Sequence, residues 1–285
     1  MVATTVSQSG LLSQIACIDT IDTDVLERLR HEALTVPANW VVEYGRYQSG
    51  GWRTLSLLNG SGDPGDVRIS DCDPVPTTLL RQMPITGRFL DSLGLRYMWV
   101  RLAWLEPSSF LWEHRDYAEL EDVERHRLHL PLVTNSSAAL VTGGARVCLD
   151  AGRLWRLTPT NVHGACNLLG PGRLHLIMDC YSDEALARVI DNAYLAPDDV
   201  TLLPAAEPTE LENRVEQARK LIMLGYDRAG EQHLLRMFYE RTVPEGRLYE
   251  LIAAAYESVG RHADAQRWID SKAVLLGGER AEVLQ

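Results

Sequence analysis

Short stretches of alternating apolar and polar residues crowd the middle of this chain, and they limit its fold more than any other feature. They lie at 97–105, 127–133, 139–141, 146–149, 152–157 and 173–179. The third and fourth flank Thr142-Gly143-Gly144-Ala145, a sequence typical of a hairpin turn. Strands this short and this closely spaced predict a β-sandwich or a β-barrel across residues 96–180.

The two ends of the chain have a helical pattern instead. Asp22 and Thr23 precede an amphipathic stretch and predict a capped N-terminal helix. After a proline-marked stretch, residues 209–277 read as several helices, in which Leu221-Ile222, Tyr226 and Gly230 recur thirty positions later as Leu251-Ile252, Tyr256 and Gly260. This recurrence suggests two helical hairpins of tetratricopeptide type. We therefore expect a β-rich domain with an N-terminal extension over 1–185, a linker over 186–208 and a helical accessory domain over 209–285.

Charge and cysteine content exclude several classes of protein. With 28 basic against 39 acidic residues the net charge is −11, and no basic block offers a footprint for nucleic acid or a membrane surface. The five cysteines form no Cys-x-x-Cys pair, which argues against a disulfide framework and a zinc ribbon. The first basic residue is Arg28, and no apolar run reaches the ~18 residues of a membrane span. These features predict a cytoplasmic protein.

A histidine-aspartate pair in the strand-rich region is the main candidate for chemistry. His114 and Asp116 are two positions apart, so in an extended segment their side chains share a face. His163 follows 49 positions after His114 and can complete a face of two histidines and one carboxylate from a neighbouring strand. Such a face leaves metal positions open for a cosubstrate, a substrate and O₂, as in non-haem Fe(II) oxygenases.

Arginines on the predicted strands suggest an anionic ligand near this triad. Arg173, His175, Ile177 and Asp179 share one face of their strand, while the intervening leucines and Met178 share the other. Arg127 and His129 alternate with leucines in the same way. A buried arginine needs an anion, and its planar fork matches a carboxylate. Two such arginines suggest a dicarboxylate cosubstrate and a carboxylate-bearing substrate, although a structural role stays open for Arg127.

The motifs taken together resemble a known family. They are the segments 114–121, 127–135, 152–155 and 173–179, with His163 between the last two. In combination they resemble the aspartyl/asparaginyl β-hydroxylase-like Fe(II)/2-oxoglutarate dioxygenases, closest to the bacterial branch with the L-proline cis-hydroxylases. The Gly51-Trp52 segment and the helical tail resemble that branch more weakly. The resemblance implies a mainly β fold with α-helices: a double-stranded β-helix (jelly roll, cupin) core, N-terminal helices and a C-terminal helical domain.

The resemblance also implies roles for individual residues. His114, Asp116 and His163 would bind Fe(II), Arg173 would pair with the distal carboxylate of 2-oxoglutarate, and His129 would lie close to this cosubstrate. Arg127 would hold the carboxylate of either the cosubstrate or the substrate. Trp99 and Arg101 share a strand face and Tyr117 follows the iron ligands, so these three are candidate substrate-pocket residues.

The expected activity is hydroxylation of a free amino acid or an amino-acid-derived small molecule, with Fe(II), 2-oxoglutarate and O₂. Proline-like substrates are favoured by the resemblance alone. One alternative is the same chemistry on a peptide, a cyclic dipeptide or a carrier-bound aminoacyl group. Another is a non-catalytic jelly roll whose helical tail binds a partner, and a homo-oligomer stays open in each case. A zinc hydrolase is more remote, because the compact pair His126-x-x-His129 lacks a helical context.

Overall fold

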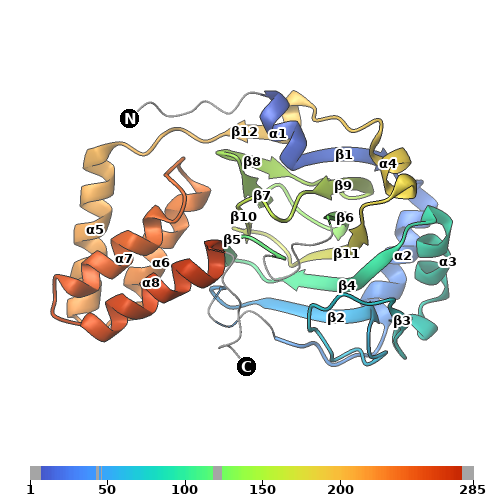
Figure 1. Ribbon diagram of the computed structural model, residues 1–285, viewed down its shortest axis with the longest axis horizontal. Coiled ribbons are helices and arrows are strands. Elements are labelled where there is room, and N and C mark those ends of the chain that lie inside the picture. Colours follow the sequence, from blue (N-terminus) through green and yellow to red (C-terminus); the bar gives the residue numbers. More distant parts are fainter. Residues whose placement is uncertain (1–7, 43–44, 46, 118–123, 278–285) are drawn as a thin grey trace.

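Two antiparallel β-sheets form the centre of the computed structural model, which describes residues 8–42, 45, 47–117 and 124–277 (Figure 1). The larger sheet contains, in spatial order, β1 (Ile15–Thr20), β9 (Arg153–Leu157), β6 (Arg125–Val133), β11 (Arg173–Tyr181), β4 (Tyr97–Leu105), β2 (Trp52–Asn59) and β3 (Val75–Pro76). The smaller sheet contains β12 (Val200–Leu202), β8 (Ala145–Cys148), β7 (Ala138–Thr142), β10 (His163–Asn167) and β5 (Ser109–His114). The predicted mainly β double-stranded β-helix core with N- and C-terminal helices is confirmed.

Helices cover the outer faces of these sheets. The helices are α1 (Gln8–Gln14), α2 (Thr23–Thr35), α3 (Pro84–Leu93), α4 (Glu184–Ile190), α5 (Pro208–Met223), α6 (Asp227–Leu235), α7 (Arg247–Glu257) and α8 (His262–Leu276), with short 3₁₀ turns η1 (Leu80–Gln82), η3 (Pro197–Asp199) and η4 (Arg236–Tyr239). Asp22 caps α2 as predicted, since its carboxylate accepts hydrogen bonds from the Asp24 and Val25 amides. Within the described ranges, no helix is both long and apolar enough to cross a membrane.

The alternation along the strands separates two cores. Leu174, Leu176 and Met178 of β11 pack into an apolar cluster with α2 and α3 on the outer face of the larger sheet. Ile177 points the other way, into a cluster between the two sheets. Because successive side chains of a strand alternate between its faces, Arg173, His175 and Asp179 also lie on the inner side with Ile177. The polar face predicted from the sequence is therefore an interior one.

The segment predicted as a linker, 186–208, carries secondary structure. Its residues include the end of α4 and all of β12, which pairs with β8 at the edge of the smaller sheet. The division into 1–185, 186–208 and 209–285 stays a prediction. Residues 1–7 of the first segment, residues 278–285 of the last, and residues 118–121 of the motif that starts at His114 lie outside the described residues.

The helical tail contains two successive helix–turn–helix hairpins, α5–α6 and α7–α8, but the thirty-residue repeat does not align them. The turns contain Gly225 and Gly260, which both have positive φ angles and lie thirty-five positions apart. Gly230 instead lies inside α6, where a Cβ atom would approach the Ala218 carbonyl oxygen to 2.9 Å. The thirty-residue spacing was wrong because it matched a helix-packing glycine to a turn glycine.

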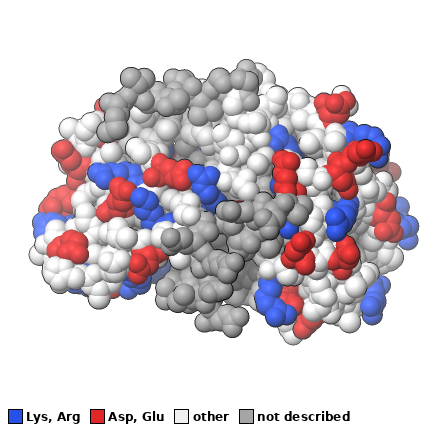
Figure 2. All heavy atoms as spheres, viewed as in Figure 1, with Lys and Arg blue, Asp and Glu red and all other residues white. Residues whose placement is uncertain are grey.

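Surface charges of both signs are interspersed over the face drawn in Figure 2. Several form ion pairs, as Arg261 does with Asp227 and Asp264 in the helical tail. The coloured residues of this face therefore form no large patch of a single sign.

Two glycine substitutions should change stability in opposite directions. A Cβ atom on Gly172, just before β11, would lie 1.9 Å from a ring carbon of Trp104. We expect Gly172→Ala to lower the free energy of unfolding by about 2 kcal/mol, because the rigid indole must move. Gly87 lies in α3 with nothing within 4 Å, so Gly87→Ala should raise it by up to about 1 kcal/mol. Urea unfolding followed by tryptophan fluorescence measures both; equal stability of the two variants would contradict this packing.

Candidate metal centre

Three side chains that can ligate a metal converge at one end of the space between the sheets. His114 ends β5, His163 begins β10, and the antiparallel register places them directly opposite each other. Asp116 follows β5, with its carboxylate oxygens 3.7 Å from Nε2 of His114 and 3.4 Å from Nε2 of His163. The candidate ligand atoms lie within 4.8 Å of one another, and all three residues are buried. This donor set suits a divalent transition metal, including Fe(II).

Backbone carbonyls orient both histidines for ligation. Nδ1 of His114 lies 2.6 Å from the Trp112 carbonyl oxygen, and Nδ1 of His163 lies 2.9 Å from that of Asn161. Each Nδ1 therefore carries the proton and donates it, which leaves the Nε2 lone pair directed at the site. Burial lowers the pKa of His114 to about 4, so its imidazole is neutral, as a metal ligand must be.

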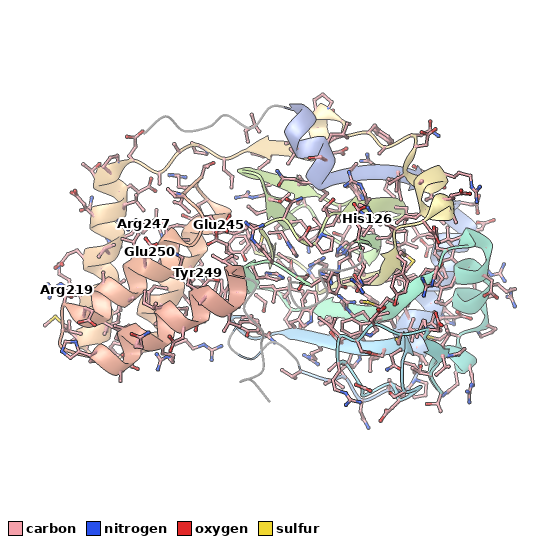
Figure 3. The ribbon with its side chains drawn as sticks, viewed as in Figure 1. His126, Arg219, Glu245, Arg247, Tyr249 and Glu250 are labelled. Atoms are coloured by element: carbon pink, nitrogen blue, oxygen red, sulfur yellow. The ribbon has the colours of Figure 1, made fainter. Side chains whose placement is uncertain are left out.

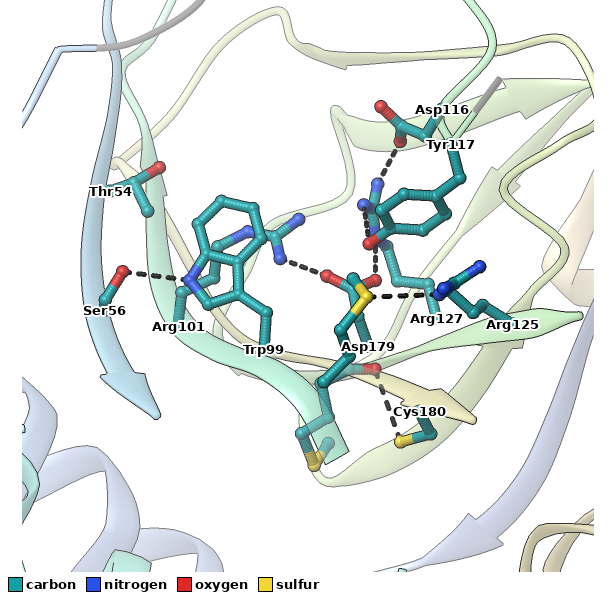
Figure 4. Close-up of polar contacts among 12 residues, drawn as sticks. Thr54, Ser56, Trp99, Arg101, Asp116, Tyr117, Arg125, Arg127, Asp179 and Cys180 are labelled. Carbon is teal, nitrogen blue, oxygen red and sulfur yellow. Dashed lines mark hydrogen bonds and ion pairs between the residues drawn. The ribbon is translucent and has the colours of Figure 1, made fainter. Parts of the chain in front are cut away.

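A chain of buried charges continues from the carboxylate of this triad (Figure 4). Arg127 donates from Nη1 to Asp116 and from Nε to Asp179, the latter over 2.7 Å. Asp179 also forms an ion pair with Arg101. Burial alone would raise the pKa of Asp116 and Asp179, but the neighbouring arginines hold both below their usual range. Two carboxylates and two guanidinium groups thus neutralise each other in a site away from water.

Asp179 is the residue that sequence reasoning missed. Arg127 was predicted to bind the carboxylate of a small molecule and Arg101 to lie in the substrate pocket, whereas the carboxylate next to both of them belongs to the protein. The signal was present, because Asp179 is on the inner face of β11 and lies opposite Arg127 in the strand ladder. Only the pairing of β11 with β6 and β4 brings these three side chains together.

Trp99 and Tyr117 lie beside these arginines. The guanidinium of Arg101 stacks 3.7 Å from the ring centroid of Trp99, whose indole N–H donates to the Ser56 hydroxyl. The Tyr117 hydroxyl accepts a hydrogen bond of 2.9 Å from Arg127. Tyr117 also has a φ of 65°, an uncommon value for a residue with a side chain. Trp99 therefore contacts Arg101, and Tyr117 contacts Arg127, on the side away from the cavity.

Arg173 lies in the same interior without a carboxylate partner. Its Nε donates to Nε2 of His175 over 2.9 Å, and its Nη2 lies 3.0 Å from Nδ1 of the same imidazole. Its buried Nη1 has no hydrogen-bond partner among the described residues, nor does Nε2 of the neighbouring His129. Burial lowers the pKa of Arg173 to about 10, but this value is still high enough for the guanidinium to be charged at neutral pH. An unpaired buried cation is costly, so this end of the site suits an anionic ligand.

One cavity contains both features. Its lining is His114, Asp116, His163, Arg101, Arg127, His129 and Arg173, with the apolar residues Trp52, Leu111, Leu140, Leu157, Ala165 and Ile177. The structure thus brings seven of the nine sequence-predicted site residues to one cavity, and places Trp99 and Tyr117 outside its lining. Trp52 is a wall residue to which the sequence analysis assigned no role.

The buried histidines should make the metal-free protein sensitive to acid. Burial lowers the pKa of His114 to about 4, and lowers those of His129 and His175 well below the usual value. The unfolded chain takes up these protons near pH ~6.5, so the free energy of unfolding falls as pH drops from there towards 4. His114 alone should account for about 2 kcal/mol between pH 7 and pH 5. Urea unfolding in EDTA measures this difference.

The control uses a histidine on the surface. His114→Gln should reduce the loss between pH 7 and pH 5, whereas His31→Gln, on the exposed face of α2, should leave it unchanged. An equal pH dependence of wild type and His114→Gln would show that His114 does not remain neutral in the folded protein.

Comparison with known proteins shows which family the chain resembles in sequence. Residues 17–183 match the family model of aspartyl/asparaginyl beta-hydroxylase. The chain is 27% identical over 150 residues to L-proline cis-3-hydroxylase 1 of a Streptomyces species, covering 50% of this chain and 51% of that protein. It is 28% identical over 142 residues to L-proline cis-4-hydroxylase of Rhizobium meliloti, covering 48% and 50%. The alignments thus span about half the length of these curated relatives.

Among solved structures, a Pseudomonas putida prolyl-4-hydroxylase is similar with a TM-score of 0.42 and 16% identity, over 61% of this chain and 96% of that one. A Burkholderia pseudomallei oxidoreductase of the 2OG-Fe(II) oxygenase family has a TM-score of 0.40 and 15% identity, over 56% and 79%. The family model covers more than half of the chain, including most strands of both sheets. The chain therefore belongs to the aspartyl/asparaginyl beta-hydroxylase family.

Proposed function

We propose that this protein is an Fe(II)- and 2-oxoglutarate-dependent hydroxylase of a free amino acid or an amino-acid-derived small molecule, with proline-like substrates favoured. The observation that carries the proposal is a single cavity lined by His114, Asp116 and His163 and by an arginine with an unpartnered nitrogen. A metal face and a carboxylate-binding group in one enclosed site are what a chelating dicarboxylate cosubstrate requires.

The Nε2 atoms of His114 and His163 and a carboxylate oxygen of Asp116 would hold the iron. Iron and 2-oxoglutarate, when bound, would supply with O₂ the oxidising power that converts a C–H bond into C–OH. The Trp112 and Asn161 carbonyls keep the Nδ1 proton of each histidine in place. Arg127 binds Asp116 and so sets the direction of the ligating carboxylate.

Arg173 would pair with the distal carboxylate of 2-oxoglutarate. Its Nε donates to His175, and its Nη1 has no hydrogen-bond partner among the described residues, so Nη1 is free to bind a ligand. His129 lies beside it, with Nδ1 3.3 Å from Nδ1 of His175 and Nε2 unpartnered. Both imidazoles have pKa values lowered by burial, so they are neutral and add no competing charge. The guanidinium of Arg173 would therefore be the single positive charge that pairs with the distal carboxylate of 2-oxoglutarate.

The apolar part of the lining would exclude water from the metal face. Trp52, Leu111 and Leu140 form part of this wall and are buried. Two similar curated proteins are named as L-proline hydroxylases, which supports a small amino-acid substrate. Turnover of a peptide or a carrier-bound aminoacyl group, with none of a free amino acid, would replace the substrate part of the proposal and leave the chemistry intact.

The activity can be tested with anaerobically reconstituted protein given Fe(II), 2-oxoglutarate, O₂ and a panel of free amino acids. We expect mass spectrometry to find one added oxygen on a panel member and an equal amount of succinate. His163→Ala should abolish succinate formation, because it removes one of three ligands. Succinate formation at the wild-type rate in this variant would exclude His163 from the metal site.

The cosubstrate anchor has a separate test. Arg173→Ala should raise the KM for 2-oxoglutarate about 100-fold, because the variant leaves a carboxylate buried without its partner. Arg153→Ala is the matched control, since Arg153 also lies on a strand and pairs with Asp199 outside the cavity. An unchanged KM in Arg173→Ala would move the anchor to another cation, with Arg127 as the next candidate.

A further inference from the structure

The two strands that carry the histidine ligands pair with an irregular register. His163 lies opposite His114 and Ala165 lies opposite Leu111, so three steps along β5 match two steps along β10. The extra residue forms a β-bulge between Leu111 and His114, and a bulge leaves backbone groups without ladder partners. The position of His114 therefore depends on what stabilises this bulge.

Two tyrosines from the helical tail, of which Figure 3 labels Tyr249, supply donors to the bulged segment. Tyr239 of η4 donates its hydroxyl hydrogen to the Leu111 carbonyl, and Tyr249 of α7 donates to the Glu113 carbonyl. Both side chains are almost wholly buried, with relative exposures of 1% and 0%. Burial raises the pKa of both hydroxyls well above the usual value, so both stay protonated donors.

Gly164 provides the space that Tyr239 needs. A Cβ atom at this position, opposite the bulge, would lie 2.9 Å from the Tyr239 hydroxyl oxygen and 3.0 Å from the Leu111 carbonyl oxygen. A larger residue would push the tyrosine away from the carbonyl. The close approach thus depends on a glycine next to the ligand His163.

Further contacts from the tail surround His114. The Gly246 amide donates to the Glu113 carboxylate over 3.1 Å, and the Arg115 amide donates to the Leu275 carbonyl over 2.9 Å. The Arg115 guanidinium binds the carboxylate of Glu245. The residues before and after His114 are therefore both held by the helical tail.

We propose that Tyr239 and Tyr249 are positioning residues of the metal centre: their hydroxyl groups hold the bulged end of β5 so that His114 stands opposite His163. This role rests on the proposed function, because it assumes that the triad binds a metal. The helical tail is then part of the site's architecture, although none of its described residues is a candidate ligand or lines the cavity.

Metal affinity tests this role without any turnover. Purified full-length protein is titrated with Co²⁺, and binding is followed by the visible absorption of the bound ion. Tyr239→Phe and Tyr249→Phe should each weaken Co²⁺ binding about 10-fold and alter the absorption bands, because an orienting partner is lost behind a ligand. Tyr256→Phe is the matched control: Tyr256 is equally buried in α7, but its hydroxyl binds Glu231 within the tail.

The control should keep the wild-type Co²⁺ affinity even if its Tm falls as far as those of the other two variants. Wild-type affinity and absorption in both Tyr239→Phe and Tyr249→Phe would overturn the positioning role, whatever their Tm. Each hydroxyl binds a different carbonyl, so each folded variant also decides the role of its own tyrosine: wild-type affinity in one variant removes that tyrosine from the proposal. Gly164→Ala should weaken Co²⁺ binding as Tyr239→Phe does.

Failure of the proposed function has a different signature. In that case wild type and His114→Ala would bind Co²⁺ equally weakly, which would overturn the metal centre and the positioning role together. A wild type that binds Co²⁺ more tightly than His114→Ala supports the centre, and the tyrosine variants then decide the positioning role alone.

Discussion

The pairing of β5 with β10 is the interaction on which the site depends, because it places His114 opposite His163 at the end of the smaller sheet. Without the extra residue in β5, Glu113 would lie opposite His163, and His114 would point to the other face of the strand. A regular ladder would thus remove a ligand. The hydroxyl groups of Tyr239 and Tyr249, which lie far from His114 in the sequence, bind this irregular segment. Gly164, on the opposite strand, leaves the space for Tyr239.

Charge balance sets the second constraint. Asp116 and Asp179 neutralise Arg127 and Arg101 within the protein, which leaves Arg173 as a cavity cation without a carboxylate among the described residues. Buried ion pairs add little stability on their own, but removing one member leaves an uncompensated charge. The network therefore fixes the direction of the Asp116 carboxylate and leaves Arg173 as the cation for the anionic ligand that we propose.

The helical tail and the smaller sheet share one apolar core. Phe110 and Trp112 of β5 pack in a single cluster with Tyr239 and Tyr249 of the tail and Trp268 of α8. The outer face of the smaller sheet is buried by these helices in the way that α2 and α3 bury that of the larger one. Any change that loosens this core therefore reaches the strand that ends in His114.

The sequence by itself determined what depends on local spacing. Period-two alternation is a property of a single strand, so the polar inner face of β11 and the shared face of His114 and Asp116 could be predicted without a partner strand. Three features were decided only by tertiary structure: Asp179 as the counter-ion of two arginines, the bulge before His114, and the register of the helical hairpins. Each depends on which residues of distant segments lie opposite one another. A shift of one residue in a strand reverses its faces, and nothing in one strand's own pattern specifies its partner's register.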